Sequence, residues 1–207
     1  MNCERKKDNV PFYHYDRSGK LEPGMSLELS KDFGPIEERL QGSSAFLRKH
    51  FPDGLSKHGL QYLSLFEESV IDCDPQKTRD AFAPLNSHLI EHTLELTRRA
   101  FFPKYQSRLQ SVFCLPSPSD ISDWPELNSA AGKLFEIDDY RDFDGPFDSY
   151  WLRGGITVHD DGFLTWSAAL DFDCAYKYWA GVRSDHPRLE VLVKPPVRIG
   201  RDVSLER

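Results

Sequence analysis

The chain lacks the long apolar segments that membrane proteins and secretory precursors carry. No apolar run approaches the roughly 18 residues that a membrane-spanning helix needs. Residues 1–8 are charged and contain no apolar stretch of the kind found in a secretory signal. We therefore expect a protein without a membrane segment or a Sec-type signal, located in the cytoplasm.

Positive charge is also in short supply. Lys and Arg together number 26 against 33 Asp and Glu, which leaves a formal net charge of -7 at pH 7. Phosphate binding depends on clustered Lys and Arg, so this balance opposes a general electrostatic surface for nucleic acid. It leaves room only for a local basic groove.

Two common motif classes are absent. The cysteines lie far apart and form no Cys-x-x-Cys pair: Cys3, Cys73, Cys114 and Cys174. This spacing indicates neither a zinc knuckle nor a dense disulfide scaffold, and idle thiols in a reducing compartment are expected. No Gly-x-Gly-x-x-Gly follows a predicted strand, which disfavours a reversible Rossmann dehydrogenase.

An acidic stretch runs from Asp138 to Asp148. It does not fit a calcium-binding EF-hand loop, because alignment on Gly145 would require acidic residues at Tyr140 and Trp151. We expect instead a solvated acidic loop folded over a pocket through neighbouring aromatic side chains.

What is present suits one α+β domain over residues 1–207. Hydrophobic residues make up 39% of the 207, which is enough for a sizeable single core. Apolar periodicity and turn residues predict helices and strands in mixed order. Strands are expected at 10–17, 106–115, 134–137, 156–159, 163–166 and 189–193, and helices at 34–50, 55–69, 87–101, 120–132 and 167–181.

The strand predicted at 189–193 carries an unusual carboxylate. Four apolar residues surround Glu190, and Pro195 and Pro196 close the run. One interpretation is an outward-facing Glu on an edge strand, where charge discourages aggregation. The other is a Glu that points inward for chemistry.

The sequence Glu-Val-Leu-Val, followed by a short spacer and a second Val, resembles the last catalytic strand of ADP-ribosyltransferases. The likeness is to the DNA-targeting toxin branch and to uncharacterised bacterial families. It implies a split β-sheet core with covering helices. It also implies that Glu190 faces the nicotinamide ribose of NAD.

The first predicted strand is similar to that of the same superfamily, in which a His or an Arg holds NAD. His14 and Arg17 both correspond. They are three apart, so on a strand they would face opposite sides and only one would contact NAD. We favour His14, whose alternative role is a core imidazole bonded to backbone.

Further anchors of the resemblance lie in the middle and near the end of the chain. Arg108, Ser111 and Phe113 correspond to residues around the nicotinamide pocket, and Arg108 is expected to pair with the pyrophosphate. Ser111 has an ordinary strand hydroxyl as its alternative role. Tyr178 lies in an Ala-x-x-Tyr-Trp pattern. We expect it to be mainly a packing residue and only secondarily a ligand contact.

The resemblance implies a mono-ADP-ribosyltransferase that consumes NAD as a substrate. Arginine-modifying members have Gln or Glu two residues before the catalytic Glu, whereas this chain has Arg188. We therefore expect a non-arginine acceptor, on a protein in preference to nucleic acid. Family likeness suggests a bacterial toxin or effector, acting in the cytoplasm of its own cell or of a target cell.

A competing motif lies on the predicted helix 87–101. His88, Glu91 and His92 fit His-x-x-Glu-His, in which two histidines one turn apart share a zinc ion and the Glu activates its water. The motif needs a third ligand downstream, and Glu126 and Glu136 are available without a supporting pattern. A zinc hydrolase and a non-catalytic binding module are thus the alternatives to the transferase.

Overall fold

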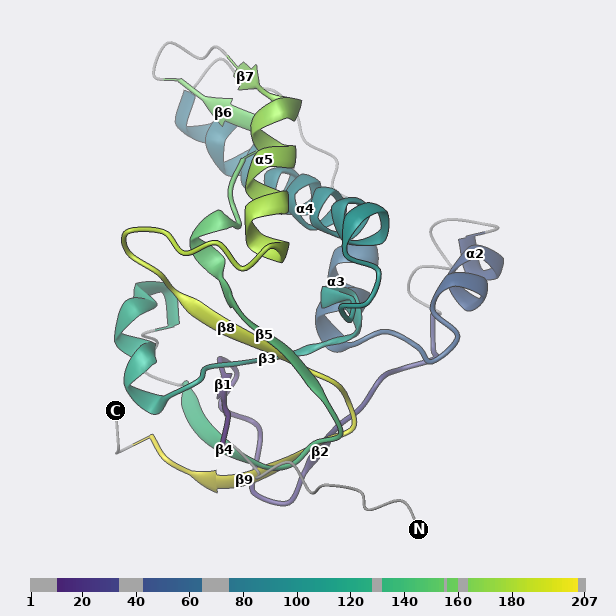
Figure 1. The fold of residues 1–207 in the computed structure, drawn as a ribbon, viewed down its shortest axis with the longest axis vertical. Coiled ribbons are helices and arrows are strands. Elements are labelled where there is room, and N and C mark those ends of the chain that lie inside the picture. Colours follow the sequence, from purple (N-terminus) through teal and green to yellow (C-terminus); the bar gives the residue numbers. More distant parts are fainter. Residues whose placement is uncertain are drawn as a thin grey trace.

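The computed structural model describes residues 11–33, 43–64, 75–127, 132–154, 156–159 and 164–204, and its centre is a pair of antiparallel sheets (Figure 1). One sheet has the order β1-β4-β9-β2, and the other has the order β3-β8-β5. The strands are β1 (Tyr13–Asp16), β2 (Ser26–Leu27), β3 (Val112–Cys114), β4 (Lys133–Asp139), β5 (Phe143–Asp148), β8 (Leu189–Val193) and β9 (Val197–Asp202).

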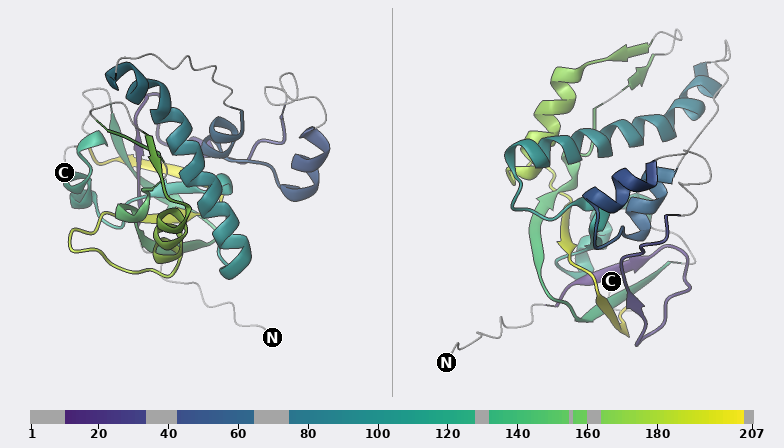
Figure 2. Two further views of the ribbon diagram at one scale, coloured as in Figure 1. Left: turned by 90° about the horizontal axis from the view of Figure 1, so that it is seen from above. Right: turned by 90° about the vertical axis from the view of Figure 1, so that its right-hand side faces the viewer.

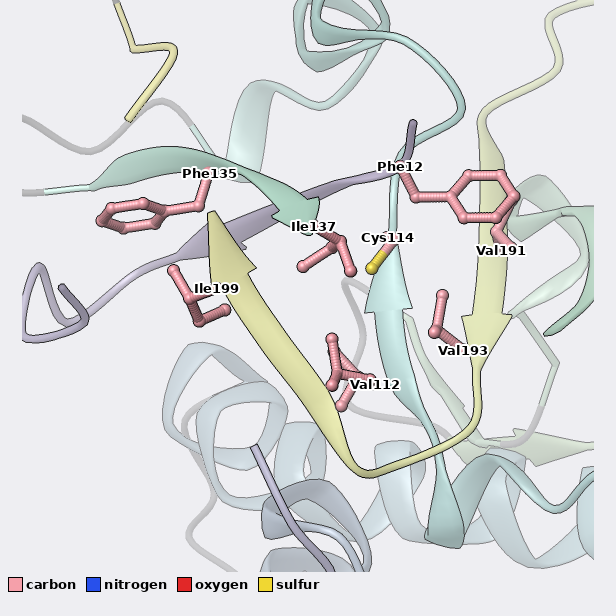
Figure 3. Close-up of a cluster of buried hydrophobic side chains, with 9 residues drawn as sticks. Phe12, Val112, Cys114, Phe135, Ile137, Val191, Val193 and Ile199 are labelled. Carbon is pink, nitrogen blue, oxygen red and sulfur yellow. The ribbon is translucent and has the colours of Figure 1, made fainter. Parts of the chain in front are cut away.

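Hydrophobic side chains from both sheets fill the space between them (Figure 3). Val191 and Val193 on β8 lie among residues of β4 and β9 such as Ile137 and Ile199. Cys114 contributes a buried free thiol to this core. A single β-bridge between Tyr13 and Leu115 also connects the two sheets where β1 passes β3.

The helices α3, α4 and α5 cover the other side of the three-stranded sheet (Figures 1 and 2). The helices are α2 (Ser43–His50), α3 (Lys57–Ser64), α4 (Pro75–Phe101) and α5 (Ala168–Trp179), with 3-10 turns η1 (Arg108–Gln110), η2 (Pro118–Asp123), η3 (Pro125–Leu127) and η4 (Ser149–Trp151). A hairpin of β6 (Ile156–Val158) and β7 (Leu164–Trp166) completes the fold. No helix in these residue ranges combines the length and the apolar character that crossing a bilayer requires.

The prediction of an α+β domain is confirmed, and several elements lie where the sequence indicated. Ser167 caps the start of α5 by accepting from the Leu170 backbone N–H. Gly181, at a φ of 69°, follows the end of that helix in the left-handed region that favours glycine. Helix α4 begins at Pro75, twelve residues before the predicted start at Ser87, because its first turns are largely exposed and show no apolar stripe.

The acidic stretch was the clearest error of prediction. It contains β5, which pairs with β8, and is not a loop over a pocket. Gly145, at a φ of 114°, and Pro146 form a bulge that breaks the alternating pattern and hides the strand. Asp148 is fully buried and accepts hydrogen bonds from the backbone N–H groups of Tyr150, Ser184 and Arg188.

Candidate functional site

Alternation along β8 decides where its carboxylate points. Val191 and Val193 enter the core between the sheets, so Glu190 and Leu192 face the helical layer. Glu190 is only 5% exposed, and Leu192 packs against α4 and α5. The edge-strand interpretation is therefore wrong, because the side chain of Glu190 points inward.

One oxygen of the Glu190 carboxylate is fixed by two donors. Tyr178 on α5 donates its hydroxyl to Oε1 at 2.6 Å, and Arg108 on η1 donates from Nη1 to the same oxygen. The same Nη1 also lies 2.7 Å from the Tyr178 hydroxyl oxygen. Both hydrogen bonds end on Oε1, and no residue in the described part of the chain donates to the second oxygen, Oε2.

A second carboxylate holds the other side of the Arg108 guanidinium. Glu91 on α4 accepts from Nε at 3.0 Å and from Nη2 at 2.8 Å, which is a bidentate geometry. Burial alone would lower the pKa of Arg108, but the attraction of Glu190 and Glu91 outweighs it and raises that pKa well above its usual value. Burial likewise acts to raise the pKa of Glu91, and Arg108 overcomes it and lowers that pKa.

A cavity of about 670 Å³ opens beside this cluster. Six of the seven residues predicted from the sequence line it: His14, Arg17, Arg108, Ser111, Phe113 and Glu190. The seventh, Tyr178, is fully buried behind the cavity wall and reaches the site through its hydrogen bonds to Glu190 and Arg108. Side chains nearly 180 positions apart in the sequence thus meet around one space.

His14 and Arg17 line the same cavity, contrary to the expectation that they face opposite sides. Strand β1 ends at Asp16, so Arg17 lies in the following turn and strand alternation does not govern it. The His14 ring carries its proton on Nδ1, which donates to the Phe113 carbonyl at 3.0 Å. Burial, assisted by the nearby Lys57 charge, lowers the pKa of His14, so Nε2 is an acceptor at neutral pH.

The segment predicted as a strand from 106 to 115 is a strand only in its second half. Ser107 caps the turn η1 through the Leu109 N–H, and β3 begins at Val112. The Ser111 hydroxyl is occupied, because it donates to the Ser107 carbonyl at 2.7 Å and accepts from Gln106 at 2.5 Å. This geometry favours a role for Ser111 in shaping η1 over direct ligand contact.

Arg108 is likewise less available than the sequence suggested. Its side chain is 5% exposed, and its guanidinium is engaged by two carboxylates and lies 4.6 Å from the centre of the Phe113 ring. With four of its five N–H groups engaged by Glu91, Glu190 and Tyr178, this buried guanidinium has at most one donor left for a pyrophosphate. The geometry therefore favours a role for Arg108 in holding Glu190.

Sequence reasoning missed the contribution of α3. His58 lines the cavity, with its Nε2 3.3 Å from Glu91 Oε1 and its ring 4.6 Å from that of Phe113. Lys57 and Tyr62 line the same wall. No local pattern marks these residues, because α3 reaches the site only by packing on η1.

The His-x-x-Glu-His motif has a different role from the one it suggests. Glu91 is bound to Arg108, His88 Nδ1 lies 2.5 Å from the Pro84 carbonyl, and His92 is exposed. Glu136 lies on β4 and pairs with Arg201 at the surface, while the side chain of Glu126 falls outside the described residues. In the part of the chain that the structure covers, no three His, Cys, Asp or Glu side chains are placed to hold a metal ion.

Comparison with known proteins bears on family alone. No curated protein matches the chain. One family model, described as a protein of unknown function (DUF2441), matches residues 12–204, a range that includes every residue of the site described above. The chain therefore belongs to the DUF2441 family.

Proposed function

We propose that the protein is a mono-ADP-ribosyltransferase that cleaves NAD at the nicotinamide glycosidic bond and transfers ADP-ribose to a non-arginine acceptor. The observation that carries this proposal is Glu190, a buried carboxylate with one oxygen fixed by Tyr178 and Arg108 and with its side chain at the wall of a large cavity. The finer assignment of the two sheets to an ADP-ribosyltransferase-like core is part of the same proposal.

The charge in the site suits the chemistry. When the bond from the ribose to nicotinamide breaks, nicotinamide leaves with the electron pair and the ribose carbon becomes cationic, as in glycoside hydrolysis. Glu190 and Glu91 carry two negative charges against the single positive charge of Arg108. The remaining negative charge, held in a largely dry wall, stabilises the developing cation.

The cavity has groups for the rest of the dinucleotide. Its volume of about 670 Å³ falls within the range usual for small-molecule sites. The neutral His14 offers Nε2 as an acceptor for a ribose hydroxyl. Arg17 and Lys57 are exposed cations on the lining, and they replace the buried Arg108 as the groups suited to a pyrophosphate.

The identity of the group that accepts ADP-ribose is proposed from the sequence. Arginine-modifying members have Gln or Glu two residues before the catalytic Glu, where this chain has Arg188. The Arg188 guanidinium lies 5.5 Å from the centre of the Trp124 ring, and its positive charge does not suit an arginine substrate. The negative net charge favours a protein acceptor over nucleic acid. We place the reaction in the cytoplasm, of the producing cell or of a target cell.

The test is incubation of the purified full chain with NAD labelled in its adenylate, followed by assay of free nicotinamide and of labelled macromolecules. Glu190→Gln is expected to lower nicotinamide release by roughly 100-fold or more, because the amide keeps the shape but not the charge. Glu136→Gln is the matched control, since Glu136 lies on the other sheet and pairs with Arg201. Release that is absent from the unaltered chain, or unchanged in Glu190→Gln, contradicts the proposal.

A further inference from the structure

Two ion clusters of opposite sign, each built on a buried glutamate, lie one turn apart along α4. In the first, Arg108 serves two carboxylates, Glu91 and Glu190. In the second, Glu95 serves two cations, because Arg98 and Arg99 both pair with it at 2.9 Å or less. The first cluster therefore has one negative charge in excess, and the second has one positive charge in excess.

Only the first cluster faces the cavity. Glu91, Arg108 and Glu190 line it, whereas Glu95, Arg98 and Arg99 do not. Glu95 instead holds the turn η1 through the Ser107 hydroxyl, which donates to it at 2.8 Å. The two glutamates thus both secure η1 to the helix, but only Glu91 acts on the charge of the site.

We propose that Glu91 is a positioning residue that holds Arg108 so that Glu190 is oriented without being neutralised. The inference rests on the proposed NAD-cleaving function. Without Glu91, Arg108 would pair with Glu190 alone, and the Arg108–Glu190 pair would be electrically neutral. With Glu91, the same guanidinium fixes Oε1 of Glu190 while the cavity wall keeps one net negative charge.

Other titratable groups face the two carboxylates from the surrounding elements. His58 and Tyr62 approach from α3, Tyr178 approaches from α5, and His88 and His92 neighbour Glu91 on α4 itself. Tyr178 is neutral near pH 7, because burial and the negative charge of Glu190 raise its pKa well above 10.0. His58 is the one of these groups whose ring nitrogen lies within 3.3 Å of Glu91.

The size of the effect follows from Coulomb's law. Removing one unit charge several ångströms from a developing cation, at an effective dielectric constant of about 20, changes the rate by roughly tenfold or more. The loss should fall on kcat more than on KM for NAD, because cleavage moves the positive charge from the nicotinamide ring of the bound substrate onto the ribose beside the carboxylate. Replacement of Glu91 also removes a negative charge, which favours the charged form of the acidic groups left in the site and should move the acid limb of the pH–rate profile to lower pH.

The experiment measures kcat, KM and the pH–rate profile for nicotinamide release by the full chain and by Glu91→Gln. We expect kcat to fall roughly tenfold or more and the acid limb of the profile to move to lower pH. The matched control is Glu95→Gln, which removes a buried carboxylate from the same helix face. Its melting temperature should fall by a similar amount, but its acid limb should stay in place.

A merely structural role predicts a different result. Glu91→Gln would then lower the melting temperature and the amount of active protein, as Glu95→Gln does, without moving the acid limb, and that outcome overturns the inference. If Glu91→Gln does not fold, Glu91→Asp keeps the charge and provides the test, because a retained acid limb with a modest loss of kcat supports the charge role and a shifted limb contradicts it. An unaltered chain that releases no nicotinamide would instead contradict the proposed function.

Discussion

Removal of Arg108 should damage stability more than any surface substitution. Arg108→Met deletes the guanidinium that lies between Glu91 and Glu190 and leaves these two buried carboxylates without that cation. Breaking a buried ion pair on one side costs about 3–5 kcal/mol. In a chain of 207 residues, each kcal/mol lowers the melting temperature by about 2–4 °C, so a fall of roughly 6–20 °C is expected.

The pH dependence of this penalty gives a sharper test. In the unaltered protein the pKa of Glu91 lies below its ordinary value of 4.5, so its ion pair stabilises the fold above that pH and is lost only as pH falls through the depressed value. In Arg108→Met, the largest influence that lowers the pKa of Glu91 is gone and the neighbouring His58 is left to oppose burial, so the folded-state pKa of Glu91 rises. The penalty is then largest near pH 7.5 and shrinks toward pH 4.5 as the carboxyl takes up a proton.

Urea unfolding at pH 7.5 and pH 5 measures both quantities. Arg99→Met is the matched control, because Arg99 is partly exposed and Arg98 still pairs with Glu95. Its penalty should stay below about 1 kcal/mol at both pH values. An Arg108→Met penalty below about 1 kcal/mol, or one that is equal at the two pH values, would refute the description of this cluster.

Three further predictions concern the surroundings of the site. Gly59→Ala should destabilise the protein by at least about 2 kcal/mol and reduce NAD turnover, because the new Cβ would lie 2.1 Å from the Leu109 carbonyl oxygen and push η1 away; an unchanged melting temperature would contradict this. Asp148→Asn should cost about 2 kcal/mol at pH 7 and less at pH 3, since hydrogen bonds from backbone N–H groups hold the pKa of Asp148 below 3.8. The stabilisation by the Asp148 carboxylate is lost progressively as pH falls below 3.8 and through that depressed value, and equal urea midpoint shifts at both pH values would argue against it. His14→Ala, made in the Glu190→Gln background to prevent turnover, should weaken NAD binding roughly tenfold by calorimetry, and an unaltered Kd would remove His14 from the site.

Local sequence patterns were sufficient for β8 and α5. In β8, apolar residues on both sides of Glu190 specify a strand. Alternation then places the side chains of Glu190 and Val191 on opposite faces of the sheet. In α5, Ser167 and Gly181 mark the two ends of the helix through capping and left-handed geometry. These features depend on neighbours a few residues away, which is the range over which a sequence pattern carries information.

The partners of Glu190 could not be predicted in the same way. Arg108 is 82 positions away from it and 17 from Glu91, so their contacts depend on how α4 and η1 pack on the sheet. The same packing explains the misleading zinc motif. A helix pattern places Glu91 beside His88 and His92, but only the fold shows that Glu91 faces a buried guanidinium.

Irregular backbone accounts for the remaining errors. Ser107 and Ser111 use their hydroxyls to close a 3-10 turn inside a segment whose composition suits a strand. Gly145 and Pro146 place a bulge inside a segment whose acidity suits a loop. In both places, side-chain to backbone bonds and a single glycine conformation override the average preference of the sequence.

The most direct measurement is the rate of nicotinamide release from NAD by the unaltered chain and by Glu190→Gln, with the two proteins matched in melting temperature and circular dichroism. We predict steady release by the unaltered chain and a rate at least about 100-fold slower in Glu190→Gln, because the buried carboxylate supplies the negative charge at the reacting ribose. Equal rates in the two folded proteins would show that residue 190 does not carry the reaction.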